Sequence, residues 1–273
     1  MFTLEIIHAE RPSAPPRAAI FDFDGTVSLI RRGWHSLLLG MSMDILRTTP
    51  QGKDAPEEEL RQLIRRNVEL NIGKMTIYQC YALADAVKYY GGTPREPEDY
   101  NRQYMNLLNR QVQPRLAALR AGRDPHELIV PGTYEMLDML KRRGVRLYLA
   151  SGTEDELVKE DAQLLRLTDY FDGGMYGGLP DPTAFSKAGI VKKMLQENGL
   201  LGEQIIGFGD GHTETVDVKA AGGFAVGVAS DETTRQGVDP WKRDQLIRAG
   251  ADWIIPDYGD PEQLESRIFD KTP

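Results

Sequence analysis

The sequence predicts an α/β fold, a doubly wound parallel sheet that carries an inserted all-helical cap domain. Two observations lead to this prediction. From residue 131 to residue 255, short apolar runs of strand length alternate with segments of helical periodicity, which is typical of a parallel sheet with helices on both faces. Between residues 29 and 121 the periodicity is helical throughout.

The length of the chain supports the same division. A chain of 273 residues suits a core domain of ordinary size with a smaller insertion. We expect residues 1–28 and 125–273 to form the core and residues 29–124 to form the cap. The composition, 41% hydrophobic and 27% charged, is that of a globular protein and argues against a disordered or fibrous chain.

Charge and cysteine content restrict the partners and the compartment. The net charge of −8 repels nucleic-acid backbones and anionic membranes, so we expect neither as a partner. Cys80 is the single cysteine, and residues 1–10 lack the pattern of a secretion signal, which together favour the cytoplasm. No apolar run approaches the roughly 18–20 residues that span a bilayer. A homodimer is compatible with the sequence.

The first predicted core element follows a proline-rich linker. Pro12, Pro15 and Pro16 favour an extended chain, because each fixes its own φ angle and disfavours helix in the residue before it. Residues 1–9 before the linker are expected to form either an edge strand or an ordered arm. Residues 18–23 form an apolar run that ends in carboxylates, which indicates a buried strand that delivers polar groups at its carboxyl end.

The predicted cap consists of helices. Apolar residues recur at helical spacing in residues 35–46, 57–70 and 75–90. Residues 97–120 are expected to form either one long helix or two shorter ones. Pro114 is the expected break, because a proline removes one helical hydrogen bond and its ring clashes with the preceding turn.

In the rest of the core, predicted helices and strands alternate along the chain. The helices span residues 133–143, 155–165, 187–198 and 215–221, and the strands span residues 145–150, 204–208, 224–228 and 253–255. A glycine-rich stretch at 173–178 and the two chain crossings between core and cap are candidate hinges.

Four polar clusters lie at predicted strand ends or just beyond them. They are residues 22–26, residues 151–153, Lys187, and residues 209–214. In open α/β sheets, ligands bind outside the carboxyl ends of the strands, near the point where the strand order switches. We therefore expect these clusters to meet at one edge of the sheet, although they lie far apart in the chain.

These residues resemble the haloacid dehalogenase-like (HAD) hydrolase superfamily. Asp22-Phe-Asp-Gly-Thr26 matches its first motif, Leu149-Ala-Ser-Gly-Thr153 its second, and Lys187 at a helix start its third. Gly207-Phe-Gly-Asp-Gly211 with Glu214 matches the fourth. The resemblance covers the whole Rossmann-like core in order. The helical insertion between motifs one and two is similar to the C1 cap of the phosphoglycolate phosphatase and β-phosphoglucomutase branch.

The two acids of the first motif have separate expected roles. Asp22 is the candidate nucleophile, because a carboxylate that attacks phosphorus splits one difficult displacement into two easier ones. Asp24 is the candidate general acid and base, which protonates the leaving oxygen and then activates water. The resemblance adds that family phosphatases carry an acid at the position of Asp24, whereas dehalogenases and phosphonatases do not.

The carboxylates also suit a Mg²⁺ site, because this ion prefers oxygen ligands and keeps several waters. Asp210 would complete the site with the side chain of Asp22 and, by the family pattern, with the backbone carbonyl of Asp24. Glu214 lies one helical turn further on and is expected to act through a water or a contact with a ligand. The family often has Asp at this position.

Other residues are expected to bind the substrate. Ser151, the amide of Gly152 and the charge of Lys187 would bind the phosphoryl oxygens, on which charge accumulates in the transition state. Ser151 and Lys187 thus join Asp22 and Asp24 as catalytic residues.

Three further residues are substrate-binding candidates with open alternatives. Thr26 either shapes the loop after the nucleophile or contacts substrate. Arg31 either meets a substrate carboxylate or is a solvated residue at the hinge. Lys74 lies at a cap helix boundary, where it would contact substrate or remain an ordinary surface lysine.

The expected function is that of a Mg²⁺-dependent phosphatase for a small phosphorylated metabolite, such as a sugar phosphate or phosphoglycolate. Three alternatives remain open. A phosphomutase of the same branch shares all four motifs. A phosphonate-cleaving enzyme would use Lys74 as a Schiff base, although Asp24 argues against it. A non-catalytic binding protein on the same scaffold would have no physical reason to keep the full set of acids and Lys187.

Overall fold

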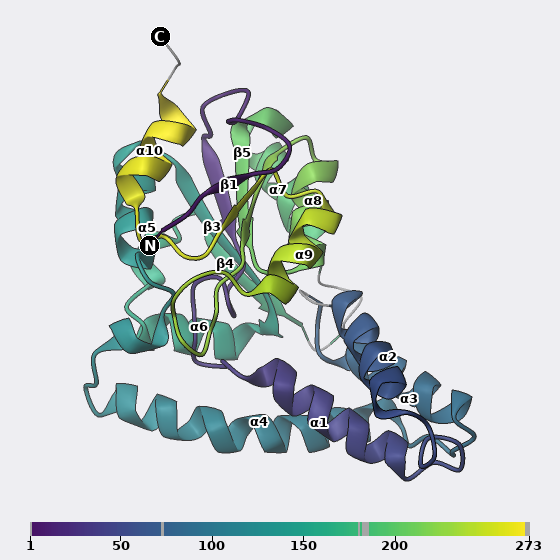
Figure 1. The fold of residues 1–273 in the computed structure, drawn as a ribbon. Helices are drawn as coiled ribbons and strands as arrows, with labels where there is room; N and C mark the ends of the chain where they lie inside the picture. The colour runs from purple at the N-terminus through teal and green to yellow at the C-terminus, as the bar shows by residue number, and fades with distance from the viewer. Residues whose placement is uncertain (1, 72–73, 180, 182–185, 271–273) are drawn as a thin grey trace.

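The computed structural model describes residues 2–71, 74–179, 181 and 186–270. Across these residues the strands form one seven-stranded sheet in the order β1-β7-β6-β5-β2-β3-β4 (Figure 1). All neighbouring strands are parallel except β1, which runs antiparallel to β7. The strands are β1 (Glu5–Ile6), β2 (Ala18–Phe21), β3 (Arg146–Glu154), β4 (Gly174–Gly178), β5 (Ile205–Gly209), β6 (Phe224–Val228) and β7 (Trp253–Ile255).

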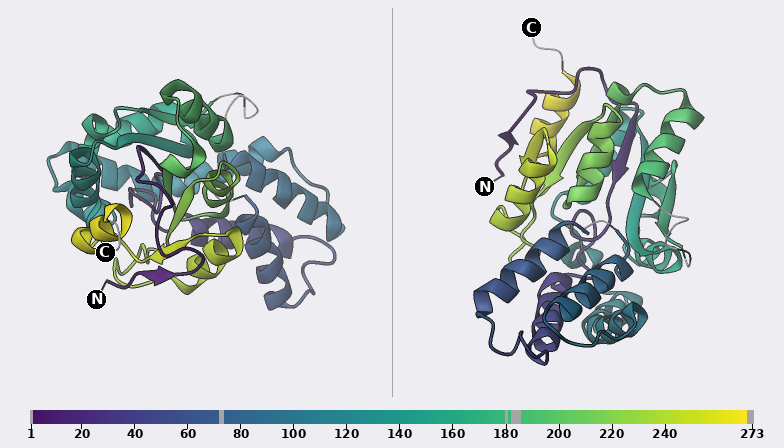
Figure 2. Two further views of the ribbon diagram at one scale, coloured as in Figure 1. Left: turned by 90° about the horizontal axis from the view of Figure 1, so that it is seen from above. Right: turned by 90° about the vertical axis from the view of Figure 1, so that its right-hand side faces the viewer.

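Helices cover both faces of this sheet, as Figure 2 shows from two sides. The core helices are α5 (Thr133–Arg142), α6 (Asp155–Leu164), α7 (Lys187–Asn198), α8 (His212–Ala220), α9 (Pro240–Ala249) and α10 (Pro261–Phe269). Short 3₁₀ turns lie at Pro125–Leu128, Thr168–Tyr170 and Gly202–Gln204. The doubly wound α/β prediction is therefore confirmed.

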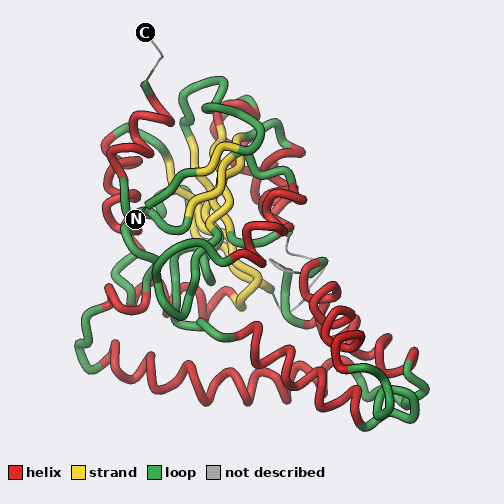
Figure 3. Tube along the Cα trace, in the orientation of Figure 1, coloured by secondary structure: helices red, strands yellow, loops and turns green. Residues whose placement is uncertain are grey.

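The cap region contains helices and loops, and the strands of the described residues all lie in the core (Figure 3). Its helices are α1 (Trp34–Arg47), α2 (Glu57–Glu69), α3 (Ile77–Tyr89) and α4 (Pro97–Arg120). They lie together beyond the carboxyl ends of β2 and β3 (Figure 1). None of the helices in the described part of the chain is both long and apolar enough to cross a membrane.

β2 is the central strand and pairs with β5 on one side and β3 on the other. Its side chains alternate between the two faces of the sheet, as they must in a strand. Ala18 and Ile20 pack in the apolar cluster that includes residues of α7 and α8, whereas Ala19 and Phe21 pack in the larger cluster on the opposite face. Both faces are buried, which explains the continuous apolar run in the sequence.

The N-terminal segment adds an edge strand, which resolves the alternative left open by the sequence. Glu5 pairs with Ile254 across the antiparallel β1–β7 ladder. The guanidinium of Arg243 donates to both carboxylate oxygens of Glu5, at 2.6 and 2.7 Å. Trp253 donates from Nε1 to the carbonyl oxygen of Ala9 at 2.8 Å, which holds the linker against the sheet.

The glycine-rich stretch at 173–178, a candidate hinge, contains the edge strand β4 (Gly174–Gly178). Its glycines allow close packing. A Cβ at Gly173 would lie 2.5 Å from the ring of Tyr148, and a Cβ at Gly177 would lie 2.3 Å from Cα of Asp155. The glycines therefore let β4 approach the β3–α6 connection.

Pro114 does not break α4, which continues through it to Arg120. The helix buries Leu108, Val112 and Leu116 on both sides of the proline. Arg115, the next residue, donates to two backbone carbonyls of the core-to-cap crossing, those of Ile30 and Arg32, at 2.6 and 3.0 Å. Tertiary packing thus outweighs the lost hydrogen bond.

Candidate active site

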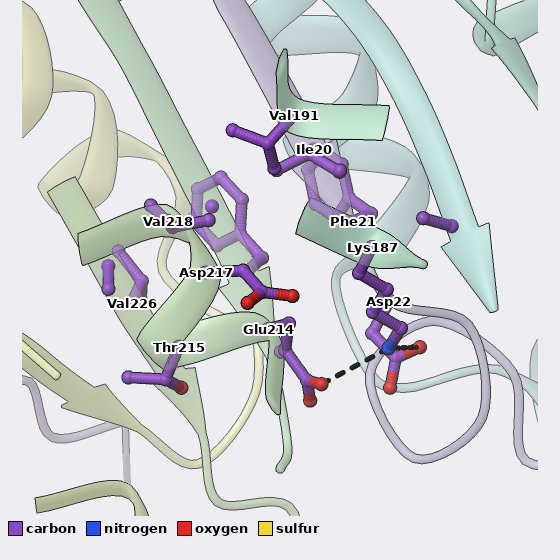
Figure 4. A pocket seen from close by; sticks show the side chains of 15 residues that line it. Ile20, Phe21, Asp22, Lys187, Val191, Glu214, Thr215, Asp217, Val218 and Val226 are labelled. Carbon is purple, nitrogen blue, oxygen red and sulfur yellow. Dashed lines mark hydrogen bonds and ion pairs between the residues drawn. The ribbon is translucent and has the colours of Figure 1, made fainter. Parts of the chain in front are cut away.

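Asp22 follows β2 directly, and its carboxylate is the centre of the site. The strand ends at Phe21, while the amide of Asp22 still donates to the carbonyl oxygen of Phe208 at 2.9 Å. Lys187 donates from Nζ to Oδ1 of Asp22 at 2.6 Å (Figure 4). Burial raises the pKa of Asp22 well above its usual value, and the charge of Lys187 opposes this effect.

Lys187 is the first residue of α7, where Ser186 caps the helix by accepting from the amide of Gly189 at 3.0 Å. The helix start thus points the lysine side chain at the end of β2. Its ammonium also donates to Oε2 of Glu214 at 3.1 Å. Burial alone would lower the pKa of Lys187, but the carboxylates of Asp22 and Glu214 raise it above the usual value. The two carboxylates thus favour the charged form of Lys187.

Asp22, Asp210 and Glu214 form a buried carboxylate group with one oxygen of each within 4.8 Å of the others. Oε1 of Glu214 accepts from the amide of Gly211 at 2.6 Å, and its Oε2 accepts from Lys187, so both oxygens are engaged. The ammonium groups of Lys187 and Lys242 take one oxygen each of Asp22 and Asp210. The second oxygens of these two aspartates have no partner among the described residues.

This arrangement fits a hard divalent cation. Asp22 and Asp210 would each present one oxygen to it, whereas both oxygens of Glu214 are already engaged, which suits an indirect role. The carboxylate of Asp24 is not part of the group, which is compatible with a contribution through its backbone carbonyl.

Gly25 shapes the loop that brings Asp22 to Asp210. Its φ angle of +79° lies in the left-handed region that glycine adopts without strain. A Cβ at this position would lie 2.1 Å from Oδ2 of Asp210. Glycine is therefore required both for the turn and for the close approach of the loop to Asp210.

Asp24 points to the second motif. Thr153 donates from Oγ1 to Oδ2 of Asp24 at 2.7 Å, and Arg31 lies 3.4 Å from Oδ1. Ser151, two residues before Thr153, is buried, and its Oγ accepts from the amide of Thr153 at 3.0 Å. The structure thus brings the first and second motifs into direct contact.

Arg31 is buried, so the solvated alternative does not describe it. Its guanidinium forms ion pairs with both Asp24 and Asp161. Burial raises the pKa of Asp161 to about 6, and the charge of Arg31 opposes the rise. Because two carboxylates already face Arg31, little of its charge remains for a substrate anion.

Thr26 is fully buried, and its Oγ1 has no hydrogen-bond partner in the described residues. Thr26 does not line the cleft that opens in front of Asp22, between the core and the cap. This position favours the loop-shaping alternative over a substrate contact.

A cleft of about 130 Å³ opens between the core site and the cap helices. Asp22, Asp24, Ser151, Gly152 and Asp210 line it from the core. Lys74 and Arg31 also line it, together with residues of α3 and α4. A much smaller cavity of about 10 Å³ lies behind Asp22 and Lys187 (Figure 4), where the apolar side chains of Ile20, Val191 and Val218 contribute to the lining.

Sequence reasoning missed Lys242, a buried lysine on α9 that lies 2.8 Å from Asp210. Asp239 caps this helix by accepting from the amide of Lys242 at 3.1 Å, and Pro240 is its first residue. This Asp-Pro pair is a helix start signal that we did not use. No sequence signal indicates that Lys242 points to the carboxylates. Thr153 was quoted within the second motif but was not assigned a contact with Asp24.

Comparisons with known proteins agree with this geometry. A protein-family model described as haloacid dehalogenase-like hydrolase matches residues 16–222. No curated protein sequence matches the chain.

Solved structures share the fold over nearly the whole chain. A predicted phosphoglycolate phosphatase from Haemophilus somnus is 19% identical, covers 92% of this chain and 99% of its own, and has a TM-score of 0.60. A β-phosphoglucomutase from Clostridium difficile is 14% identical, covers 92% and 96%, and has a TM-score of 0.58. A hydrolase from Pseudomonas syringae is 15% identical, covers 93% and 99%, and has a TM-score of 0.57.

Proposed function

Because the chain belongs to the haloacid dehalogenase-like hydrolase family, we propose that it is a Mg²⁺-dependent phosphatase for a small phosphorylated metabolite. One observation supports the proposal above the others. The buried carboxylate of Asp22 is held by Lys187 at 2.6 Å and grouped with Asp210 and Glu214. A nucleophile, a fixed cation and a metal-binding carboxylate group thus meet at the open end of β2.

In the first step, a carboxylate oxygen of Asp22 attacks phosphorus, while the other oxygen remains available to the metal ion. A bond forms between this oxygen and phosphorus, and the bond from phosphorus to the leaving alcohol breaks. Asp24 donates a proton to the leaving oxygen. Lys187 and the hydroxyl of Ser151, with the amide of Gly152, bind the phosphoryl oxygens as their charge increases.

In the second step, Asp24 is a carboxylate and accepts a proton from water. The water oxygen attacks phosphorus, the bond to Asp22 breaks, and inorganic phosphate and the free enzyme result. Thr153 and Arg31 hold Asp24 in place for both transfers, since each binds one of its carboxylate oxygens.

Mg²⁺ would be held by Asp22, Asp210 and the backbone carbonyl of Asp24. When bound, it offsets the repulsion between the carboxylates and the phosphate dianion. We also propose that residues 29–124 form a cap that closes over the site and excludes bulk water from the aspartyl-phosphate. The cleft of about 130 Å³ between core and cap suits a small molecule and not a phosphorylated protein.

The test is phosphate release from a panel of small phosphate esters, with and without Mg²⁺. We expect Mg²⁺-dependent release that both Asp22→Asn and Asp24→Asn abolish. Asp54→Asn, a variant of an exposed cap residue, is the matched control and should retain activity. Circular dichroism establishes that each variant is folded.

Two results would contradict the proposal. Folded protein that releases no phosphate from any ester in the presence of Mg²⁺ would remove the phosphatase and favour a binding protein. Turnover of a sugar phosphate only when a sugar bisphosphate is added would identify a phosphomutase that uses the same residues.

A further inference from the structure

Apolar side chains line a large part of the cleft away from Asp22. This matters because the phosphate lies at the core side, near Asp22 and Ser151, so the rest of the substrate faces the cap. The apolar side chains that line the cleft are Trp34, Met75, Ile77, Met105, Leu108 and Leu157. A leaving group that extends into this space exchanges water for apolar contacts. This favours a leaving group with an apolar carbon skeleton.

Several polar side chains interrupt this apolar lining, and two of them are amides. Gln79 on α3 is only 8% exposed, and Asn101 lies on α4. Both line the cleft, and Oε1 of Gln79 and Oδ1 of Asn101 are buried without a hydrogen-bond partner in the described residues. A buried carbonyl oxygen without a donor is unfavourable. A ligand that brings a donor to these oxygens removes that penalty.

The charges of the cleft favour a leaving group that donates hydrogen bonds over one that carries a second negative charge. Glu154 and Asp24 add carboxylates to the lining, and Arg31 is already paired with Asp24 and Asp161. On the cap side Lys74 lines the cleft, and its ammonium donates to Oδ1 of Asn71 at 3.2 Å. Hydrogen-bond acceptors therefore outnumber uncompensated cations around the leaving group.

We propose that the substrate is the phosphate monoester of a mainly apolar alcohol that carries a hydroxyl or amine, and that Gln79 and Asn101 accept hydrogen bonds from this group. The inference rests on the proposed phosphatase function and narrows its substrate class. It disfavours phosphoglycolate, whose carboxylate would face the carboxylates of Asp24 and Glu154 with Lys74 to offset them, and polyol phosphates, whose hydroxyls would face apolar side chains.

The experiment compares esters that differ by one group: butyl phosphate, 4-hydroxybutyl phosphate, 4-aminobutyl phosphate, glycerol phosphate and phosphoglycolate. We expect kcat/KM for the hydroxyl or amine ester to exceed that for butyl phosphate about tenfold, the usual size of one such discrimination. Glycerol phosphate and phosphoglycolate should be poorer than the better of the two. The hydroxyl and amine esters distinguish the two donors.

Variants test whether Gln79 and Asn101 cause the preference for the hydroxyl or amine ester over butyl phosphate. Gln79→Leu and Asn101→Leu should reduce the preference of the hydroxyl or amine ester over butyl phosphate to about threefold or less. Gln62→Leu on α2 and Asn106→Leu on α4 are the same substitutions at exposed positions and should keep the preference. A preference that survives in Gln79→Leu and Asn101→Leu would overturn the assignment.

Binding measurements test the proposed ligand class independently of the proposed phosphatase activity. Calorimetry of Asp22→Asn with Mg²⁺ measures the affinity for the same esters without turnover. Tighter binding of the hydroxyl or amine ester, with no release by the wild type, would overturn the phosphatase and support the ligand class. Phosphate release from every ester, with phosphoglycolate or glycerol phosphate preferred, would support the phosphatase and overturn the ligand class.

Discussion

The ammonium of Lys242 lies 2.8 Å from Oδ2 of Asp210, so a fixed cation already contacts a carboxylate of the candidate metal site. The same ammonium lies 2.8 Å from Oε1 of Glu232. Burial raises the pKa of Asp210 to about 6, and the charge of Lys242 opposes the rise. Lys242 therefore compensates the buried carboxylate of Asp210 and the partly buried carboxylate of Glu232, and it orients Asp210 while leaving the second oxygen of Asp210 for a metal ion.

Lys242→Met should destabilise the metal-free protein by about 3 kcal/mol, because it leaves the buried charge of Asp210 uncompensated and removes the partner of Glu232. Mg²⁺ should then raise the melting temperature of Lys242→Met more than that of the wild type, because the ion replaces the missing positive charge. Thermal unfolding with and without Mg²⁺ measures both effects.

Lys219→Met is the matched control for this variant. Lys219 donates to both oxygens of buried Asp252, at 2.8 and 2.9 Å, but these residues are not in the carboxylate group. This variant should also lose stability, but Mg²⁺ should raise its melting temperature by the same amount as that of the wild type. Equal increments in Lys242→Met and the wild type would refute the link between Lys242 and the metal site.

Thr153 should contribute to catalysis through Asp24. Thr153→Val removes the donor that holds Oδ2 of Asp24 at 2.7 Å but keeps the shape of the side chain. We expect kcat to fall about 10- to 100-fold with little change in KM, because the loss concerns proton transfer and not binding. Thr153→Ser keeps the hydroxyl and should retain most of kcat. Steady-state kinetics decide, and a fall that is as large in Thr153→Ser would exclude the hydrogen bond as the cause.

The order of the elements was predictable because the local signals agreed with the tertiary environment. The helix over residues 187–198 and the strands over residues 224–228 and 253–255 have the predicted limits. β2 was predictable because a strand that is buried on both faces is a continuous apolar run. These elements also position Asp22 and Lys187, which explains why their proximity followed from the sequence.

The failures come from interactions that no local pattern contains. Packing of α4 against the rest of the cap outweighs Pro114, and close approach explains the glycines of β4. The contact of Lys242 with Asp210 depends on the orientation of α9, a helix we did not predict. Likewise, the ion pair of Arg31 with Asp161 joins residues that only the folded chain brings together.

His35 should make stability depend on pH near neutrality. Its ring stacks on Trp241 at 4.4 Å between ring centres, which joins α1 of the cap to α9 of the core. Burial, with the charges of Arg65 and Lys242, lowers the pKa of His35, and this outweighs the opposite effect of Glu232 and Asp239.

The unfolded chain therefore takes up a proton on His35 as pH falls through about 6.5, before the folded protein does. The free energy of unfolding should fall over that range, by at most about 1.4 kcal/mol per pH unit from one group. His35→Phe keeps an aromatic ring against Trp241 and should weaken this dependence. Denaturant unfolding at pH 7.5, 6.5 and 5.5 measures it, with His8→Phe at an exposed position as the control. An unchanged slope in His35→Phe would contradict the prediction.

Gly25 provides the sharpest test of the loop geometry, because Gly122 has a similar backbone conformation without the close contact. The φ angles are +79° and +89°, and a Cβ at Gly122 would meet nothing within 4 Å. Gly122→Ala should thus cost only the backbone strain, about 1 kcal/mol. Gly25→Ala adds a Cβ at 2.1 Å from Oδ2 of Asp210 and should cost a further 1–3 kcal/mol or so from overpacking.

The two alanine variants should also differ in how much Mg²⁺ raises their melting temperatures. Gly25→Ala displaces Asp210 from the carboxylate group, so Mg²⁺ should raise its melting temperature less than that of the wild type, whereas Gly122→Ala should retain the full increment. Denaturant unfolding gives the stability difference, and thermal unfolding with and without Mg²⁺ gives the increment. If Gly25→Ala kept both the stability of Gly122→Ala and the Mg²⁺ increment, the loop would not lie against Asp210 as the structure has it.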